Sequence, residues 1–212
     1  MSEGIYQISK HFSDWKIKLN NSKTEAILFT HSRIMQKLKK DHQILLNGSK
    51  LIWHDQVKYL GVLLDSKLTF SKNIQTNVVK AKKVISTLYC LLKKHSHVNF
   101  HSKLTIYKSY IRPILTYACP VFSNCAKTHI SKLQTIQNKC LRMVLNAPYR
   151  TKISILHKLC NLPTISEFID KLSENFYHQT SKSTNNLIKE LGSYSYDSLP
   201  FRVKHKLPKK KQ

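Results

Sequence analysis

Acidic residues are scarce in this sequence, and none occurs between Asp65 and Glu167, although lysines and arginines recur throughout that interval. The whole chain of 212 residues holds 11 acidic and 36 basic side chains, which gives a formal net charge of +25. A surface with so few counter-charges repels itself and attracts polyanions such as nucleic acid. The same absence argues against metal-dependent catalysis inside the interval, because Mg²⁺ sites are built from carboxylates.

Long apolar runs, glycine and a disulfide pattern are lacking as well. No stretch approaches about 18 consecutive apolar residues, so no transmembrane helix is expected, and the N-terminal residues lack the layout of a signal peptide. The five cysteines are odd in number and widely spaced, which is typical of reduced thiols in the nucleus or cytoplasm. With only four glycines, the chain is expected to form long elements, mainly helices.

The apolar pattern predicts an α+β fold in three parts. Residues 1–70 are expected to form a mixed α/β part with a short β-hairpin and strands, residues 71–180 a mainly α-helical bundle, and residues 181–212 a linker with a basic tail. The first part begins with helical spacing over 5–15. A short buried strand is predicted over 25–30, a hairpin over 44–53 around the pair Asn47-Gly48, and one strand over 57–65 in which Gly61 makes a bulge or a close approach.

Helical periodicity takes over from residue 71. Helices are predicted over about 71–92, from about 102 to 115 with a kink at Pro113, and over about 128–146, 151–161 and 164–180. Basic side chains recur at helical spacing away from the apolar face of the first and third of these helices. We expect these six side chains to contact the phosphates of nucleic acid: Lys72, Lys80, Lys83, Lys132, Lys139 and Arg142.

Two further groups have competing interpretations. Tyr107, Tyr110 and Tyr117 could stack on bases, but their helical spacing favours packing in the core. The order Cys119-x5-Cys125-x3-His129 suggests zinc, yet the spacing is not that of a zinc knuckle or ribbon, so no metal site is predicted.

Four segments resemble, in the right order, a known polymerase family. The segment Trp15–Glu25 and the apolar strand after it resemble the region that follows the catalytic palm strand in reverse transcriptases of non-LTR retrotransposons, the jockey-like group in particular. Residues 58–70, with Lys58-Tyr59-Leu60-Gly61 at their start, resemble the primer-grip hairpin. Residues 107–122 and 133–148 resemble the thumb and the region after it. The resemblance covers roughly residues 5–180.

The resemblance implies roles for individual residues. Lys23 would lie on the pyrophosphate side of the parent active site, where a cation stabilises developing charge. Tyr59, Leu60 and Gly61 would form the primer grip, with Gly61 allowing a close approach of the backbone to primer phosphates. The implied partners are RNA and DNA, as an RNA–DNA hybrid or a primer–template, together with a missing upstream half of the polymerase.

One departure from the family pattern limits the implied activity. In the family, two metal-binding aspartates precede the segment that begins here at Trp15, whereas this sequence has only Asp14 there and no Asp-Asp pair anywhere. We therefore expect a fragment that binds nucleic acid without a catalytic centre or cofactor of its own, with Mg²⁺ needed only by the full-length parent. The alternatives are a non-catalytic RNA- or DNA-binding module and a non-functional remnant of a mobile element.

Overall fold

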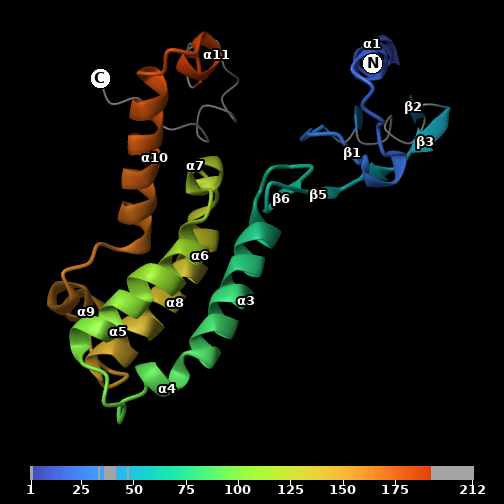
Figure 1. Ribbon diagram of the computed structural model, residues 1–212. Coiled ribbons are helices and arrows are strands. Elements are labelled where there is room, and N and C mark those ends of the chain that lie inside the picture. Colours follow the sequence, from blue (N-terminus) through green and yellow to red (C-terminus); the bar gives the residue numbers. More distant parts are fainter. Residues whose placement is uncertain (1, 33, 36–41, 47, 192–212) are drawn as a thin grey trace. The chain divides into compact units, whose positions relative to one another are not determined.

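The computed structural model describes residues 2–32, 34–35, 42–46 and 48–191 of the chain. The chain divides into two compact units, Met1–Phe70 and Ser71–Gln212, called here the N-terminal and C-terminal units. Short strands occur in the first unit and long helices in the second (Figure 1). The predicted α+β class is thereby confirmed.

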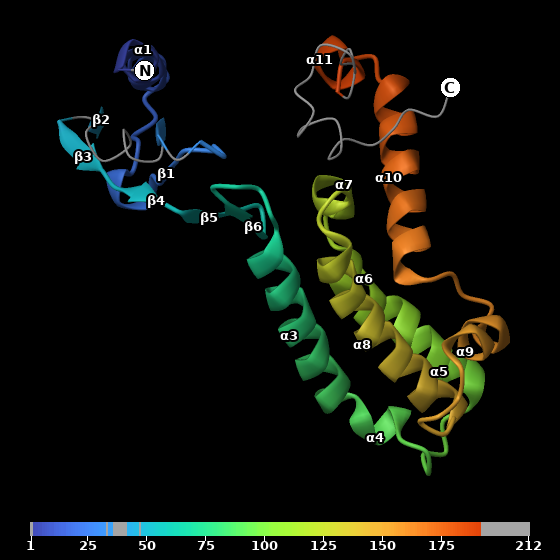
Figure 2. The same cartoon turned by 180° about the vertical axis from the view of Figure 1, so that it is seen from behind.

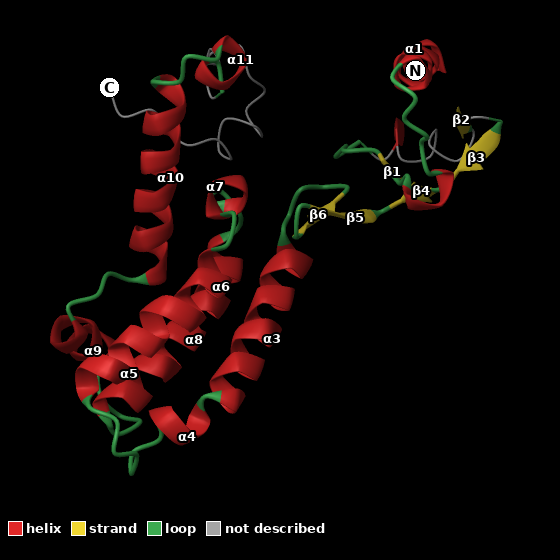
Figure 3. Ribbon diagram, in the orientation of Figure 1, coloured by secondary structure: helices red, strands yellow, loops and turns green. Residues whose placement is uncertain are grey.

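The N-terminal unit contains one helix of 13 residues, α1, followed by short strands, as Figure 3 shows. In chain order they are α1 (Ser2–Asp14), the 3₁₀ turn η1 (Asn21–Lys23), β1 (Ala26–Ile27), β2 (Ile44–Leu46), β3 (Ser49–Leu51), β4 (Trp53–His54), β5 (Gln56–Tyr59) and β6 (Val62–Asp65). Among the described residues the strands form three two-stranded sheets: β1 with β4 in parallel, and β2 with β3 and β5 with β6 antiparallel.

The hairpin predicted over residues 44–53 is confirmed over residues 44–51, where β2 and β3 are its two strands. Ile44 pairs with Leu51 and Leu46 with Ser49. Gly48 has a φ of +74°, the left-handed conformation that a two-residue hairpin turn requires. Asn47, the other turn residue of the prediction, lies outside the described residues.

The predicted buried strand over 25–30 is shorter and less buried than expected. Only Ala26 and Ile27 are paired, with β4, and both are half-buried, while Phe29 is exposed. The physical reason is the partner: β4 has two residues, so the parallel ladder ends after two pairs, and an apolar run cannot extend a strand without further backbone partners.

The prediction of one continuous strand over 57–65 is wrong. The segment folds back on itself, so that β5 pairs with β6 from Gln56↔Asp65 to Tyr59↔Val62. Leu60 and Gly61 form the turn with φ values of +45° and +84°. A tight two-residue turn needs positive φ at both positions, and a leucine at the first gives no sequence signal for it. The hairpin does agree with the element that the family resemblance implied.

Asp65 ends β6 and fixes the loop that follows it. Its carboxylate accepts hydrogen bonds from the Thr69 backbone N–H (2.9 Å), the Thr69 hydroxyl (3.0 Å) and the Phe70 backbone N–H (2.8 Å). Burial alone would raise the pKa of Asp65, but the hydrogen bonds from Thr69 and Phe70 outweigh it and hold the pKa below the ordinary value of 3.8. This structural role agrees with a turn residue at a strand end.

The lowered pKa predicts that Asp65 stabilises the N-terminal unit above pH 4 and loses this effect in acid. Below the ordinary aspartate pKa of about 4, the unfolded chain takes up a proton before the folded one does, so the free energy of unfolding falls. Both tryptophans, Trp15 and Trp53, lie in this unit, so tryptophan fluorescence during urea unfolding reports on it. Asp65→Asn should be less stable at neutral pH and less sensitive to acid. Equal pH dependence in both proteins would contradict the assignment.

The C-terminal unit is helical in its described part. Its elements are α3 (Ser71–Thr87), α4 (Tyr89–Leu92), α5 (Phe100–Ile106), the π-helical turn η2 (Tyr107–Ile111), α6 (Arg112–Thr116), α7 (Cys119–Phe122), α8 (Lys127–Leu145), α9 (Ile153–Cys160), α10 (Ile165–Ser181) and α11 (Asn186–Lys189). The helices predicted between residues 71 and 180 are present, with two differences: the helix predicted over about 71–92 is divided at Leu88 into α3 and α4, and α7 was not predicted.

Helix α8 is the centre of this unit, because it packs against α3, α5, α9 and α10. Figure 1 shows α5 in front of α8, and Figure 2, seen from behind, shows α8 in front of α5. The apolar face that the periodicity predicted for α8 is buried and includes Leu133, Cys140 and Leu141. The buried face of α3 includes Ile74 and Ala81.

The kink predicted at Pro113 is present as a change of helix type. The helix that starts as α5 widens into the π-helical turn η2 just before Pro113 and continues as α6. Proline has no N–H to donate to the carbonyl four residues earlier, and a single π turn accommodates the missing hydrogen bond. Tyr107, Ile111 and Leu115 remain fully buried on the inner side.

A polar network joins α8 to the connection between α9 and α10. The Gln134 side-chain amide donates to the side-chain oxygens of Gln137 (2.9 Å) and Asn138 (2.8 Å), and its oxygen accepts from the Ile165 backbone N–H (2.9 Å). His157 Nδ1 lies 3.0 Å from the Leu162 carbonyl, so Nδ1 carries the proton. The unprotonated Nε2 lies 3.2 Å from the Gln134 amide nitrogen, whose two protons are shared among three neighbouring acceptors. The network fixes how α8, α9 and α10 meet.

The end of the described chain departs from the predicted linker. Residues 181–191 include the short helix α11, which begins after Asn185, whose side chain accepts from the Leu187 backbone N–H. The predicted basic tail over 202–211 lies outside the described residues. In the described part of the chain every helix is too short or too polar to span a lipid bilayer.

Candidate nucleic-acid interface

The outer face of α3 carries exposed lysines. Lys72 and Lys83 are eleven residues apart, which brings them to the same side of the helix about 16 Å from each other along its axis. Lys80 lies beside them and is also exposed. The buried residues Ile74, Ala81 and Ile85 point the opposite way. The structure therefore brings the three predicted lysines of α3 together on one solvent-facing stripe.

The outer face of α8 carries a second basic stripe. Lys132 and Lys139 are seven residues apart, share one side of the helix and are exposed. This side also bears the exposed hydroxyl residues Thr128, Ser131 and Thr135.

The two stripes have no acidic residue on their own helices. In residues 71–191 of the C-terminal unit the carboxylates are confined to α10 and its continuation: Glu167, Asp170, Glu174 and Glu190. Helices α3, α5, α6 and α8 have none. Surface lysines are usually balanced by neighbouring carboxylates, and without them the stripes produce a positive potential that attracts phosphate.

Arg142, the last predicted cation of α8, is partly buried and already has protein partners. Its guanidinium carbon lies 5.5 Å from the centre of the Tyr149 ring, and Nη2 donates to the Thr151 carbonyl over 3.4 Å. Arg142 thus holds the loop between α8 and α9. It differs in this from Lys132 and Lys139, whose ammonium groups lie in solvent.

Lys23 lies in the N-terminal unit at the end of the turn η1 and is exposed. The turn is held by Asn20, whose side chain accepts from the Ser22 backbone N–H (2.9 Å) and hydroxyl (2.7 Å). The Asn21 amide donates to the Leu46 carbonyl at 3.3 Å and ties the turn to β2. The segment that resembles a catalytic element therefore presents its lysine from a rigid turn.

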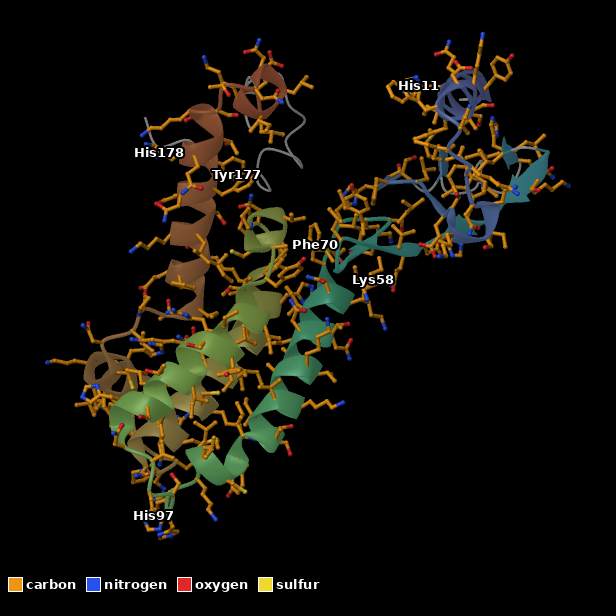
Figure 4. All side chains as sticks on the ribbon, in the orientation of Figure 1. His11, Lys58, Phe70, His97, Tyr177 and His178 are labelled. Carbon is orange, nitrogen blue, oxygen red and sulfur yellow. The ribbon has the colours of Figure 1, made fainter. Side chains whose placement is uncertain are left out.

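The three primer-grip candidates lie at the tip of the β5–β6 hairpin. Tyr59 and Leu60 are 64% and 75% exposed, and Gly61 is exposed as well. Lys58 precedes them on β5, where Figure 4 labels it. An exposed leucine with positive φ is strained, and such positions occur often at functional sites. The tip is therefore an apolar, accessible contact point, separate in the fold from η1.

The candidate stacking tyrosines separate into two environments. Tyr107 is fully buried in the core, and burial raises the pKa of its hydroxyl. Tyr110 and Tyr117 are 61% and 54% exposed. Core packing, the favoured interpretation for all three, is therefore right for Tyr107 and wrong for the other two, because the π-helical turn and the end of α6 place them outside the packed face.

Burial raises the pKa of four cysteines, Cys119, Cys125, Cys140 and Cys160, and so favours their protonated thiols at neutral pH. It raises the pKa of Cys119 and Cys125 to about 11 and that of Cys140 to about 12. The thiolate is the form that binds zinc or attacks an electrophile. Within the described residues, no three histidine, cysteine, aspartate or glutamate side chains are grouped so that they could hold a metal ion.

Two residues with clear structural roles were not predicted from the sequence. Lys103 is only 2% exposed, and its ammonium donates to the Lys93 carbonyl at 2.9 Å, which anchors the loop that carries His97 (Figure 4). Tyr149 is 88% exposed next to Arg142. The sequence offered one signal for each residue. Lys103 is a lysine on the inner side of an amphipathic helix, and Tyr149 is an aromatic residue that follows the proline of a short loop.

Comparison with known proteins gives related polymerases. The chain is 29% identical over 194 residues to the probable RNA-directed DNA polymerase from transposon X-element of Drosophila melanogaster, a match that covers 90% of this chain and 21% of that protein. It is 26% identical over 181 residues to the RNA-directed DNA polymerase from mobile element jockey of the same species, covering 85% and 19%. The corresponding polymerase from transposon BS is 26% identical, covering 92% and 20%.

No family model matches the chain, and no solved structure matches it. The chain spans about a fifth of the length of the curated relatives that it matches. The motif order and the similarity over most of the chain agree with each other. The chain is thus similar over most of its length to a part of the RNA-directed DNA polymerases of mobile elements such as jockey, the resemblance that its motifs predicted.

Proposed function

We propose that this chain is a nucleic-acid-binding segment of a mobile-element RNA-directed DNA polymerase and has no catalytic centre of its own. It holds the phosphate backbone of a primer–template duplex through the outer faces of α3 and α8. The observation that carries the proposal is the pair of exposed lysine stripes in an interval without any carboxylate. The relatives support it, because they are polymerases that copy RNA into DNA.

The stripes suit phosphate rather than base recognition. Lysine is a point charge on a flexible stem, and cations repeated along a helix can follow a backbone without reading sequence. In this proposal the tip of the β5–β6 hairpin contacts the primer through Tyr59, Leu60 and Gly61. Lys23 contacts pyrophosphate only in an active site that is completed by catalytic aspartates from a separate part of the polymerase. Those aspartates bind the Mg²⁺.

Binding by the purified chain tests the proposal. We expect affinity for an RNA–DNA duplex with a recessed 3′ end to fall about fortyfold between 50 and 200 mM salt if three phosphates are neutralised, and about a thousandfold or more for six. Fluorescence anisotropy with matched recessed, blunt and single-stranded ligands measures this. Primer extension with Mg²⁺ or Mn²⁺ should give no product.

The outcomes separate the proposed function from its alternative. Tighter binding at a recessed 3′ end supports the polymerase segment, whereas equal binding to all duplexes favours a basic module that needs no primer terminus. Salt-insensitive binding would contradict both, since neither can hold phosphate without releasing counterions. Incorporation of dNTPs by the pure chain would show that it is catalytic and would refute the proposal.

A further inference from the structure

The basic stripe of α8 ends next to an exposed aromatic ring. After Lys132 and Lys139, the next cation on this side of the helix is Arg142, and its guanidinium lies against the Tyr149 ring. Tyr149 is 88% exposed, the highest value among the large apolar and aromatic side chains of the described residues. A single exposed aromatic ring is common on protein surfaces, but a ring at the end of a row of cations has the two features that bind single-stranded nucleic acid, an aromatic face and a basic surface.

The backbone around Tyr149 is fixed by its own hydrogen bonds. Helix α8 ends with Asn146 in the left-handed conformation (φ +53°), and the Ala147 N–H donates back to the Arg142 carbonyl at 2.9 Å. The Thr151 N–H then donates to the Pro148 carbonyl at 3.1 Å and closes a turn with Tyr149 at its first central position. The ring is therefore presented from a turn that is ordered before any ligand arrives.

Arg142 orders the same turn from the helix side. Its Nη2 donates to the Thr151 carbonyl, and its guanidinium carbon lies over the Tyr149 ring at 5.5 Å from the centre. A cation on one face of an aromatic ring holds the ring in place and leaves the rest of it open to solvent. Arg150, the second central residue of the turn, and Lys152, which follows the turn, are both exposed.

From this geometry we infer that Tyr149 is a stacking platform for an unpaired nucleobase. Lys139, Arg150 and Lys152 would bind the phosphates on either side of that base, and Arg142 positions the ring. An aromatic face combined with a basic surface is the usual way in which proteins bind single-stranded nucleic acid without reading its sequence. A base inside a duplex is stacked on both faces and offers none to the ring, so the ligand is a single strand of RNA or DNA.

The inference rests on the proposed function, in which the lysine stripes bind a duplex. It adds a second ligand, the single strand that continues from that duplex. The two claims nevertheless differ in one side chain, because Lys139 would serve both ligands and the Tyr149 ring only the single strand. Affinity for a blunt duplex depends on the lysine stripes and not on that ring, whereas affinity for a single strand depends on both.

The experiment compares binding of the full chain to oligo(U), oligo(dT) and a blunt duplex, each of about 16 nucleotides per strand. Tyr149→Leu should lower single-strand affinity about 5- to 150-fold, the range measured for loss of one base–aromatic stack, and leave duplex affinity unchanged. Tyr149→Phe should bind like the natural chain. Tyr89→Leu, at an exposed tyrosine on α4, is the matched control and should have no effect.

A second measurement tests the contact and the role of Arg142. A strand with one 5-bromouracil, irradiated in the complex, should crosslink to the peptide that contains Tyr149. Arg142→Lys keeps the charge but loses the planar guanidinium, so it should lower both the crosslinking yield and single-strand affinity while duplex binding stays within a fewfold.

The results distinguish failure of the inference from failure of the proposed function. If Tyr149→Leu binds single strands like the natural chain, or loses single-strand and duplex affinity equally, the stacking role is refuted and the lysine surface stands. If the natural chain binds neither ligand, the proposed function fails and the stacking role fails with it.

Discussion

A variant in which four lysines are replaced by glutamine is expected to bind duplex nucleic acid at least a thousandfold more weakly than the natural chain at 0.1 M salt. The glutamines replace Lys80, Lys83, Lys132 and Lys139, two on each stripe. Each neutralised phosphate contact contributes counterion release worth nearly tenfold in affinity at this salt concentration, so four lost contacts multiply to a thousandfold or more. The slope of log affinity against log salt should become shallower by about 3.6. Fluorescence anisotropy over a salt series measures both quantities.

A charge-matched control decides whether position or total charge matters. Four exposed lysines away from the stripes are replaced by glutamine: Lys10, Lys171, Lys182 and Lys189. This variant has the same net charge as the first, and it should lose only a fewfold from weaker long-range attraction. Equal losses in the two variants would show that binding is diffuse and that α3 and α8 form no defined interface.

Replacing Gln134 by alanine is expected to reduce the free energy of unfolding of the C-terminal unit by about 2–4 kcal/mol. The substitution leaves the Gln137 and Asn138 side-chain oxygens and the Ile165 N–H without the partner they have now. Gln137 is 1% exposed and Ile165 fully buried, so water cannot easily replace the lost hydrogen bonds. A buried polar group left unsatisfied costs about 1–3 kcal/mol.

Urea unfolding followed by far-UV circular dichroism measures this loss, because the long helices belong to the C-terminal unit. Gln75→Ala, at an exposed position on α3, is the control and should change stability by less than about 0.5 kcal/mol. Tryptophan fluorescence, which reports on the N-terminal unit, should show the same transition in both variants. A Gln134→Ala protein as stable as its control would mean that the network contributes nothing net.

Helices were predictable here because their determinants are local. On α3 and α8 the apolar residues recur every three to four positions, and the burial of Ile74, Leu133 and Leu141 follows from that period alone. The kink at Pro113 follows from one missing N–H. The lysines opposite the apolar stripe follow from the same geometry, so the position of the candidate stripes follows from residue spacing.

The strands were harder to predict because a strand depends on its partner. The apolar run over 25–30 is paired at only two residues, since β4 has no more to pair. The segment over 57–65 reverses direction at Leu60-Gly61, although leucine is a poor residue for a turn with positive φ. The pairing of β5 with β6 imposes that conformation, and no local pattern announces it.

The sequence by itself determined the charge, the helical periods and the relationship to jockey-like polymerases, because each is carried by residue identity and local order. Only the tertiary structure decided which cations are available to a ligand. Lys132 and Lys139 are exposed, whereas Lys103 holds the Lys93 carbonyl and Arg142 holds the turn around Tyr149. The physical reason is that a basic side chain reaches a backbone carbonyl or a ring only when another segment is folded against it.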